Sequence, residues 1–299
     1  MISRRTYALL SLVLVMIVWG STYVVTKRAV RQIPPLTLAT LRYLVATAVL
    51  VLVALARGGL LRLPRPLPIA PLVWMGLTGA ILTVGFNYGL IYGSAFQGAL
   101  VYALGPAAVA VAAVLGLGEA LSGRRIGGII LSVAGAVLVV SSGKTDPAAP
   151  HPWVGAVCMF AGVVAWAYYT VVAKRLAGAD QVVMIAWVSI IGTAMLLPLS
   201  IIELLQGPIP RPTAAGWLGV LFLGAVASAL AYVAYSWVLR ELDASLVGAY
   251  FTLDPIVGVA TAVLFLGEVL SGRQVVGAGV ALIGMWLAAS GSRVETGVR

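Results

Sequence analysis

The sequence has very little of the chemistry that water-soluble enzymes use. It contains a single cysteine, Cys158, and a single histidine, His151, so it cannot form an internal disulfide or a site with several thiol or imidazole ligands. Asp, Glu, Lys and Arg make up 9% of the chain, against about 25% in a soluble domain. There is no Gly-x-x-x-x-Gly-Lys motif for ATP, so energy must come from a gradient or from the substrate itself. We therefore expect no metal and no cofactor.

What the chain has in abundance is apolar surface. Hydrophobic residues make up 62% of it and its mean hydropathy is +1.08, which excludes a water-soluble globule and indicates that lipid surrounds the protein. Continuous apolar runs long enough to cross about 30 Å of hydrocarbon predict helices rather than a barrel. The predicted spans are 7–27, 35–56, 69–92, 95–117, 125–142, 152–173, 181–204, 214–238, 244–266 and 273–290.

The positive charges of the chain are dispersed. The formal net charge is +10, but the basic residues lie in short breaks between apolar runs, so we expect no binding of nucleic acid. With the amino terminus inside, twelve of the 19 lysines and arginines fall on the inner side and six on the outer side. We therefore predict a multi-pass protein of the bacterial inner (plasma) membrane with both termini cytoplasmic.

The sequence is internally duplicated. Residues 118–124 (GEALSGR) recur as residues 267–273 (GEVLSGR), with six of seven positions identical at an offset of 149. Charged residues are rare in this chain, so the match of both Glu and Arg indicates a true repeat. Further matched pairs are Pro106 with Pro255 at the same offset, and Trp19 with Trp166 and Lys27 with Lys174 at an offset of 147.

The number of spans in each half is odd, and this has a topological consequence. Five spans per half make the second half enter the membrane from the opposite side, which predicts an inverted repeat around a central cavity. The expected fold class is an all-α integral membrane protein with ten transmembrane helices in two five-helix inverted-topology repeats. The predicted domains are 1–143 for the first repeat, 144–151 for a linker, 152–291 for the second repeat and 292–299 for a cytoplasmic tail.

Several motifs resemble those of EamA-type members of the drug/metabolite transporter superfamily. They are Trp19-Gly20-Ser21-Thr22-Tyr23 with Lys27, Leu41-Arg42-Tyr43, a proline within the fourth and ninth spans, and Gly118-Glu119 and Gly267-Glu268 at the ends of those spans. In size and layout the chain is similar to YddG-like aromatic amino-acid exporters. The resemblance implies a ten-helix basket that exports small metabolites such as amino acids. The first span lacks the embedded acid of the small four-helix multidrug relatives, which argues against proton-driven export of cationic drugs through that helix.

Asp254 is the strongest candidate for a polar group in the cavity. It lies within the ninth span, immediately before Pro255, where a charge costs about 2.5–3.5 kcal/mol to insert, so it should face water, be paired or be protonated. Two interpretations remain: Asp254 binds substrate or a proton, or it accepts hydrogen bonds from main-chain groups that the proline frees. Its counterpart is Gly105, so one half alone would supply the charge. Pro106 and Pro255 are predicted helix bends.

Aromatic and polar residues at helical spacing complete the candidate cavity. Trp19 with Tyr23, and the corresponding pair from the second half, would place rings from both halves around one centre. The alternative is that these rings form a belt at the membrane interface. Besides Asp254, the predicted cavity residues are Trp19, Tyr23, Thr83, Asn87, Tyr102, Trp166, Tyr169, Tyr232, Ser236 and Tyr250.

Other notable residues are interpreted as structural. Arg42 either extends to the membrane interface, which we favour, or pairs with a carboxylate on another helix. Glu119 and Glu268 are predicted to fix the turns after the fourth and ninth spans, with Ser122 and Ser271 as helix caps. Small residues in the fifth and tenth spans predict close packing inside a monomer, with a homodimer interface as the alternative.

The leading hypothesis is a secondary transporter that exports neutral or aromatic amino acids by alternating access. The aromatic wall would hold the side chain of the small-molecule substrate, and Asn87, Tyr250 or Asp254 its amino end. The alternatives are an exporter of other metabolites or drugs, and a channel-like facilitator. A membrane enzyme is disfavoured because the chain lacks paired intramembrane carboxylates and a Ser-His pair.

Overall fold

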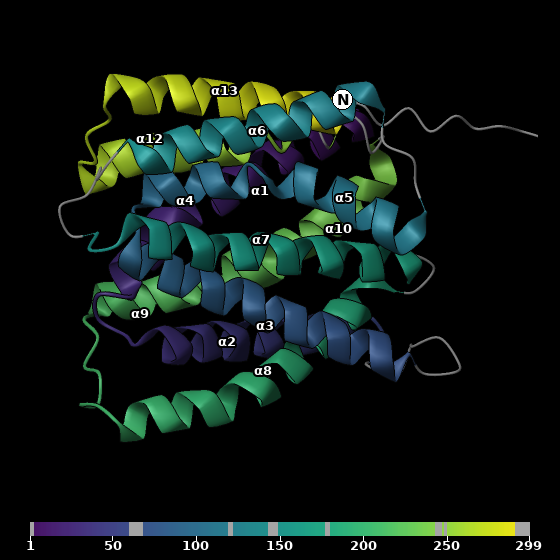
Figure 1. The fold of residues 1–299 in the computed structure, drawn as a ribbon. Helices are drawn as coiled ribbons and strands as arrows, with labels where there is room; N and C mark the ends of the chain where they lie inside the picture. The colour runs from purple at the N-terminus through teal and green to yellow at the C-terminus, as the bar shows by residue number, and fades with distance from the viewer. Residues whose placement is uncertain are drawn as a thin grey trace, which may run out of the picture.

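The computed structural model describes residues 3–59, 68–118, 122–142, 149–176, 180–242, 247 and 250–290, and these residues form helices and connecting turns without any strand. Figure 1 shows the helices side by side in one bundle. Their bounds are α1 (Arg4–Ala29), α2 (Pro35–Ala56), α3 (Ile69–Tyr92), α4 (Ala95–Tyr102), α5 (Gly105–Leu117), α6 (Gly123–Ser141), α7 (Pro152–Arg175), α8 (Gln181–Leu205), α9 (Ala214–Leu221), the π-helix η1 (Phe222–Leu230), α10 (Ala231–Glu241), α12 (Leu253–Leu266) and α13 (Gly272–Ser290).

The helices have the length and surface expected in a membrane. Among the described residues, eight helical segments are long and apolar enough to cross a bilayer, and Leu253–Leu266 and Gly272–Ala288 are shorter apolar helices. Large apolar side chains such as Leu115 and Leu264, each 75% exposed, cover the outside of the bundle. Within the predicted span 244–266, Val247, Tyr250 and residues 253–266 are helical, while residues 244–246 and 248–249 lie outside the described part of the chain.

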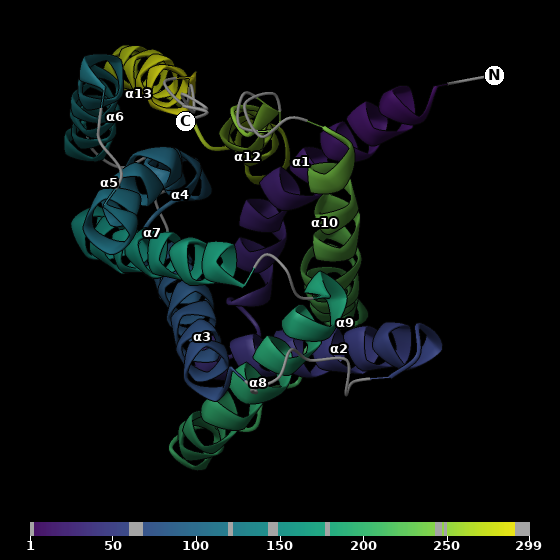
Figure 2. The ribbon, with the colours of Figure 1, turned by 90° about the vertical axis from the view of Figure 1, so that its right-hand side faces the viewer.

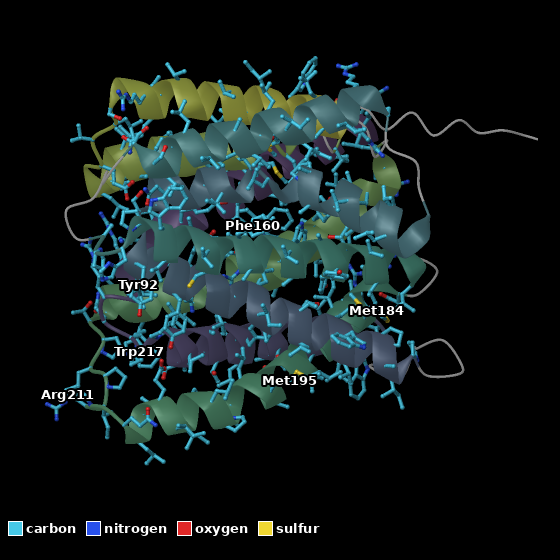
Figure 3. All side chains as sticks on the ribbon, in the orientation of Figure 1. Tyr92, Phe160, Met184, Met195, Arg211 and Trp217 are labelled. Carbon is cyan, nitrogen blue, oxygen red and sulfur yellow. The ribbon has the colours of Figure 1, made fainter. Side chains whose placement is uncertain are left out.

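The two ends of the bundle differ in what they contain. The end where α1 begins and α13 ends, called here the amino end, carries the ion pair of Arg4 with Glu241 at 3.0 Å. Figure 3 shows Tyr92, Arg211 and Trp217 toward the opposite end.

The view along the bundle in Figure 2 shows α6 beside α13 at one corner and α2 crossing α8 at another.

Two helices are interrupted just before a proline. The fourth predicted span is divided into α4 and α5 at Ala103 and Leu104, and Pro106 follows in the first turn of α5. In the second half a turn at Phe251 and Thr252 precedes α12, with Pro255 in its first turn. Proline lacks an N–H donor and its ring clashes with the preceding helical turn, so a break forms on its amino-terminal side.

Helix caps agree with the sequence analysis where they are described. The Ser122 hydroxyl accepts a hydrogen bond from the Arg125 main-chain N–H, as predicted. The main-chain N–H of Ser271 donates to Gln274, and the N–H of Gln274 donates to the Ser271 hydroxyl, which is the reciprocal pattern of a capping box.

Small residues let α6 and α13 approach each other closely. A Cβ atom added at Gly135 would lie 2.7 Å from the Cα of Ala281, and one added at Gly128 would overlap Ala288. Such contacts allow helix backbones to touch where no hydrophobic force drives them together. The small residues of the predicted fifth and tenth spans therefore pack against each other within one chain.

Candidate functional site

A cavity of about 420 Å³ lies at the centre of the bundle, and both halves of the chain contribute to its walls. Its walls are mostly apolar and aromatic, which is typical of sites for small organic molecules. Eight residues predicted from the sequence line it: Trp19, Tyr23, Thr83, Tyr102, Pro106, Trp166, Tyr232 and Asp254.

Asp254 and Tyr23 join the two halves at this cavity. The Tyr23 hydroxyl on α1 donates a hydrogen bond of 3.0 Å to Oδ2 of Asp254, which lies in the first turn of α12. Within the described residues, no main-chain N–H donates to this carboxylate. The cavity wall and the Tyr23 hydroxyl, rather than main-chain groups freed by Pro255, thus form the surroundings of the carboxylate.

The aromatic wall consists of two groups of rings. In one, Trp19 lies 5.2 Å from Tyr232 between ring centroids, and Trp166 lies 6.3 Å from Tyr232 in an edge-to-face arrangement. In the other, Tyr102 is edge-on to both Phe86 at 5.2 Å and Tyr23 at 6.1 Å. Edge-to-face packing holds each ring in a fixed orientation, so the cavity has a defined shape before any ligand enters.

A π-helix supplies polar anchors for two residues of the first half. The indole N–H of Trp19 donates to the carbonyl oxygen of Ala227 at 3.0 Å, and Nε of Arg42 donates to the Ser228 hydroxyl at 2.7 Å. Both acceptors lie in η1, where the wider turn displaces the helix surface, and such segments often occur at functional sites. Arg42 lines the cavity, so the prediction that it extends to the membrane interface is wrong. The guanidinium instead binds the Ser228 hydroxyl at the cavity wall.

Five predicted residues lie outside the lining of the central cavity. Asn87 is 1% exposed and its amide donates to the carbonyl oxygen of Pro35 at 2.8 Å, which ties α3 to the start of α2. Tyr169 stacks on Trp166 and lines a smaller adjoining cavity. Ser236 donates to the carbonyl oxygen of Tyr232 in its own helix. Tyr250 packs in an apolar cluster with α1 and α10, and Pro255 is buried in α12.

Other lining residues were absent from the sequence prediction. Besides Arg42, they include Phe86, Tyr235, Phe251 and Arg125. Phe86 and Tyr235 each follow a predicted residue by three positions and therefore share its helical face, a signal that was present in the sequence. Arg125 lies in the first turn of α6 and sets the cavity margin toward the amino end.

Buried polar contacts hold the helices together near the opposite end. Lys27 is 2% exposed, and its ammonium group donates to the carbonyl oxygens of Leu90 at 2.7 Å and Gly93 at 2.6 Å, at the end of α3. A cation is favourable at this helix end because the last carbonyl groups carry partial negative charge.

Glu268 makes the complementary contact at a helix start. Its carboxylate, 3% exposed as a residue, accepts hydrogen bonds from the main-chain N–H groups of Ala95 at 2.8 Å and Phe96 at 2.9 Å. The sequence predicted that Glu268 fixes the turn after its own span. The structure shows that its carboxylate caps α4, which lies in the other half of the chain. Glu119, its predicted counterpart, lies outside the described residues.

This arrangement defines a class of protein. A bundle of apolar helices around an aromatic cavity with a few polar groups is the architecture of a membrane carrier of small molecules. Within the described residues there is no cluster of His, Cys, Asp and Glu side chains that could hold a metal ion.

The comparisons with known proteins identify the family. The sequence profile of the EamA-like transporter family matches residues 6–141 and, separately, residues 153–290. The chain belongs to the EamA-like transporter family, within the drug/metabolite transporter superfamily, and is a multi-pass membrane transporter.

Similar proteins come from archaea and bacteria. An uncharacterized transporter of Archaeoglobus fulgidus is 28% identical over 95% of this chain and 97% of its own length. The inner membrane transporter YedA of Escherichia coli is 28% identical over 92% and 88%. A probable terminal-alkyne amino-acid exporter of Streptantibioticus cattleyicolor is 26% identical over 95% and 94%. A chain of known crystal structure, 22% identical, has the same fold with a TM-score of 0.67 over 95% of this chain and 96% of that chain.

Proposed function

We propose that this chain is a secondary transporter that exports small amphipathic metabolites, foremost neutral and aromatic amino acids, across the bacterial inner membrane. The observation that carries the proposal is the central cavity, whose aromatic walls come from both halves and which contains the Asp254 carboxylate. Its volume of about 420 Å³ is suitable for a molecule of this size. The family membership and the amino-acid exporter among the similar proteins support the same substrate class.

The proposed architecture is ten transmembrane helices in two inverted repeats, with the domain bounds predicted above. The family profile matches each half separately, which supports a duplication. The helix pairs also support it, because α6 packs on α13 and α2 on α8, each pair joining equivalent helices of the two halves. The interruptions before Pro106 and Pro255 lie at the same repeat offset. The small-residue packing of α6 on α13 is internal, and we propose that the working unit is a monomer.

Transport would proceed by alternating access. The cavity extends from Tyr23 and Asp254 along α5 to Arg125, toward the amino end, which in the proposed orientation is cytoplasmic. Toward the opposite end, buried hydrogen bonds of Lys27 join α1 to α3 within the first half, and those of Glu268 join the second half to α4 of the first half. The arrangement corresponds to a state that receives substrate from the cytoplasm. Bending at the interruptions before Pro106 and Pro255 would then open the other side.

Flux measurements in liposomes test the proposal. Purified protein in proteoliposomes should carry radiolabelled neutral or aromatic amino acids with saturable kinetics, and unlabelled amino acid on the far side should accelerate the flux. Saturable flux without this acceleration would favour a channel-like facilitator. Absence of saturable flux for every amino acid would reject amino acids as the substrate class and would favour other metabolites or drugs as substrates.

A further inference from the structure

Resting on the proposed function, we propose that the cavity recognises both charged ends of a free amino acid. In this proposal Arg42 binds the substrate carboxylate and Asp254 binds its ammonium group. The substrate class is therefore a small zwitterion, and Arg42 is the residue that distinguishes an amino acid from an amine. The argument depends on the contacts of these two residues in the described part of the chain.

The Arg42 guanidinium has hydrogen-bonding capacity left for a ligand. Its Nε donates to Ser228, whereas its two terminal nitrogens have neither a hydrogen-bond partner nor a carboxylate partner among the described residues. These terminal nitrogens are also not among the fully buried side-chain atoms that lack a partner, so they reach the space of the cavity. A guanidinium fixed at Nε presents its remaining N–H groups in a plane that matches the two oxygens of a carboxylate.

A small polar recess adjoins this guanidinium. A second cavity of about 60 Å³ shares Arg42, Thr83 and Tyr232 with the central cavity, and it is also lined by Ser189 and Ser228. The recess therefore combines one cation with the hydroxyl groups of Ser189 and Ser228, since the hydroxyl of Thr83 already donates to the carbonyl oxygen of Gly79 at 3.1 Å. A carboxylate is the small group that such a set of donors fits best.

Arg42 and Asp254 lie on different halves of the chain, and neither has a charged counterpart at the equivalent position of the other half. The repeat offsets place Ser189 at the position equivalent to Arg42 and Gly105 at the position equivalent to Asp254. Arg42 is held by η1 and Asp254 by Tyr23, and among the described residues they form no ion pair with each other. Because intramembrane charges are costly, two such charges without a counter-ion among the described residues favour a ligand that supplies both opposite charges.

This pair of charges also selects against other ligands. A purely cationic molecule in the cavity would leave Arg42 without a counter-ion and be repelled by it. A purely anionic molecule would meet the same difficulty at Asp254. A site built for a polar group discriminates strongly against an analogue that lacks it, because the site's own groups are then left unpaired.

Three related substrates test the inference in the unmodified protein. Initial rates of uptake into proteoliposomes are measured for radiolabelled L-phenylalanine, L-phenylalaninamide and N-acetyl-L-phenylalanine, after subtraction of the flux into protein-free liposomes. If another neutral amino acid is transported faster than L-phenylalanine, that amino acid, its amide and its N-acetyl derivative are used instead. We expect the KM to rise about tenfold or more when either charged end is masked.

Variants assign each end to a residue. Arg42→Gln should raise the KM for the free amino acid about tenfold and lower that for the cationic amide, because the repulsion by Arg42 is removed, and Arg42→Lys should restore part of the difference. If Arg42 had only a structural role, Arg42→Gln would raise the KM for the amino acid and the KM for the amide by the same factor. Asp254→Asn should likewise remove the discrimination against the N-acetyl derivative. Arg211→Gln, which removes an exposed arginine far from the cavity, is the matched control and should keep both preferences.

The outcomes separate this inference from the proposed function. Equal KM values for the amino acid and its amide in the unmodified protein would overturn the role of Arg42 and leave amino-acid transport in place. Absence of flux for every amino acid would overturn both. If Arg42→Gln cannot be purified in folded form, the comparison of substrates in the unmodified protein decides alone.

Discussion

The hydroxyl of Tyr23 donates a hydrogen bond of 3.0 Å to the carboxylate of Asp254, although 231 residues separate them in the chain. The contact joins α1 of the first half to α12 of the second half at the wall of the central cavity. Any relative movement of the halves at this level changes the surroundings of Asp254. The charge of the cavity and the position of the two halves are thereby coupled.

Replacement of Asp254 by Asn should depress transport. The amide retains the size of the side chain and an acceptor for the Tyr23 hydroxyl, but it loses the charge that attracts an ammonium group. We expect amino-acid flux in proteoliposomes to fall about tenfold or more. Tyr23→Phe, which removes the hydrogen bond and keeps the ring, should have a smaller effect. Unchanged flux of a stably folded Asp254→Asn protein would assign Asp254 a structural role.

Lys27→Met should destabilise the protein. The substitution removes a buried cation from the end of α3 and leaves the carbonyl groups of Leu90 and Gly93 without these hydrogen bonds. Each hydrogen bond to a charged group contributes about 1.5–3 kcal/mol, so a clear fall in the thermal unfolding temperature in detergent is expected. Arg28→Met is the matched control. Arg28 also donates to a carbonyl group, that of Phe265, but it is exposed, so its loss should lower the unfolding temperature less.

The features predicted correctly from the sequence depend on residues that are close together along the chain. The positions of the apolar spans follow from hydropathy, and the helix interruptions follow from Pro106 and Pro255. Trp19 and Tyr23 were found because two aromatic rings one helical turn apart recur in the repeat. In each case a physical rule links the residue to its immediate neighbours in the sequence.

The features that the sequence did not reveal depend on partners on other helices. Asn87 is polar and was predicted to line the cavity, yet its amide donates to the carbonyl oxygen of Pro35. Arg42 was predicted to extend to the membrane interface because its partner Ser228 could not be identified from the sequence. Ser228 lies in a π-helix, residues 222–230, and nothing in that segment, which includes no proline, indicates a π-helix. The partners of Glu268 lie more than 170 residues away, in the other half. Helical periodicity predicts on which face of a helix a residue lies, but not which atoms of other helices its side chain contacts.

Adjacent glycines in α6 should respond oppositely to substitution by alanine. At Gly128 an added Cβ would overlap the backbone of α13 at Ala288, so Gly128→Ala should push the helices apart and cost about 1–3 kcal/mol. At Gly127 an added Cβ has nothing within 4 Å, so Gly127→Ala should be neutral or stabilise the helix by up to about 1 kcal/mol. Thermal unfolding of both variants in detergent measures the difference. Equal unfolding temperatures would show that α6 and α13 are not packed as closely as described.

The sidedness of the cavity can be measured with introduced cysteines. The chain has one native cysteine, so a Cys158→Ala background carries no competing thiol. Ala113 lines the cavity on α5 toward the amino end, whereas Ala99 on α4 is fully buried outside the lining. In the proposed orientation, Ala113→Cys should react with a membrane-impermeant maleimide in inside-out vesicles faster than in right-side-out vesicles. Ala99→Cys should react in neither.

Substrate adds a second condition to the same measurement. If the halves alternate around Asp254, a transported amino acid will shift part of the population to the state open on the other side. Labelling of Ala113→Cys from the cytoplasmic side should then slow, because the cavity closes at that end. A rate that is the same from both sides and unaffected by substrate would indicate a continuously open pore. Preferential labelling in right-side-out vesicles would instead reverse the proposed orientation, while a carrier mechanism would still require the rate to depend on substrate.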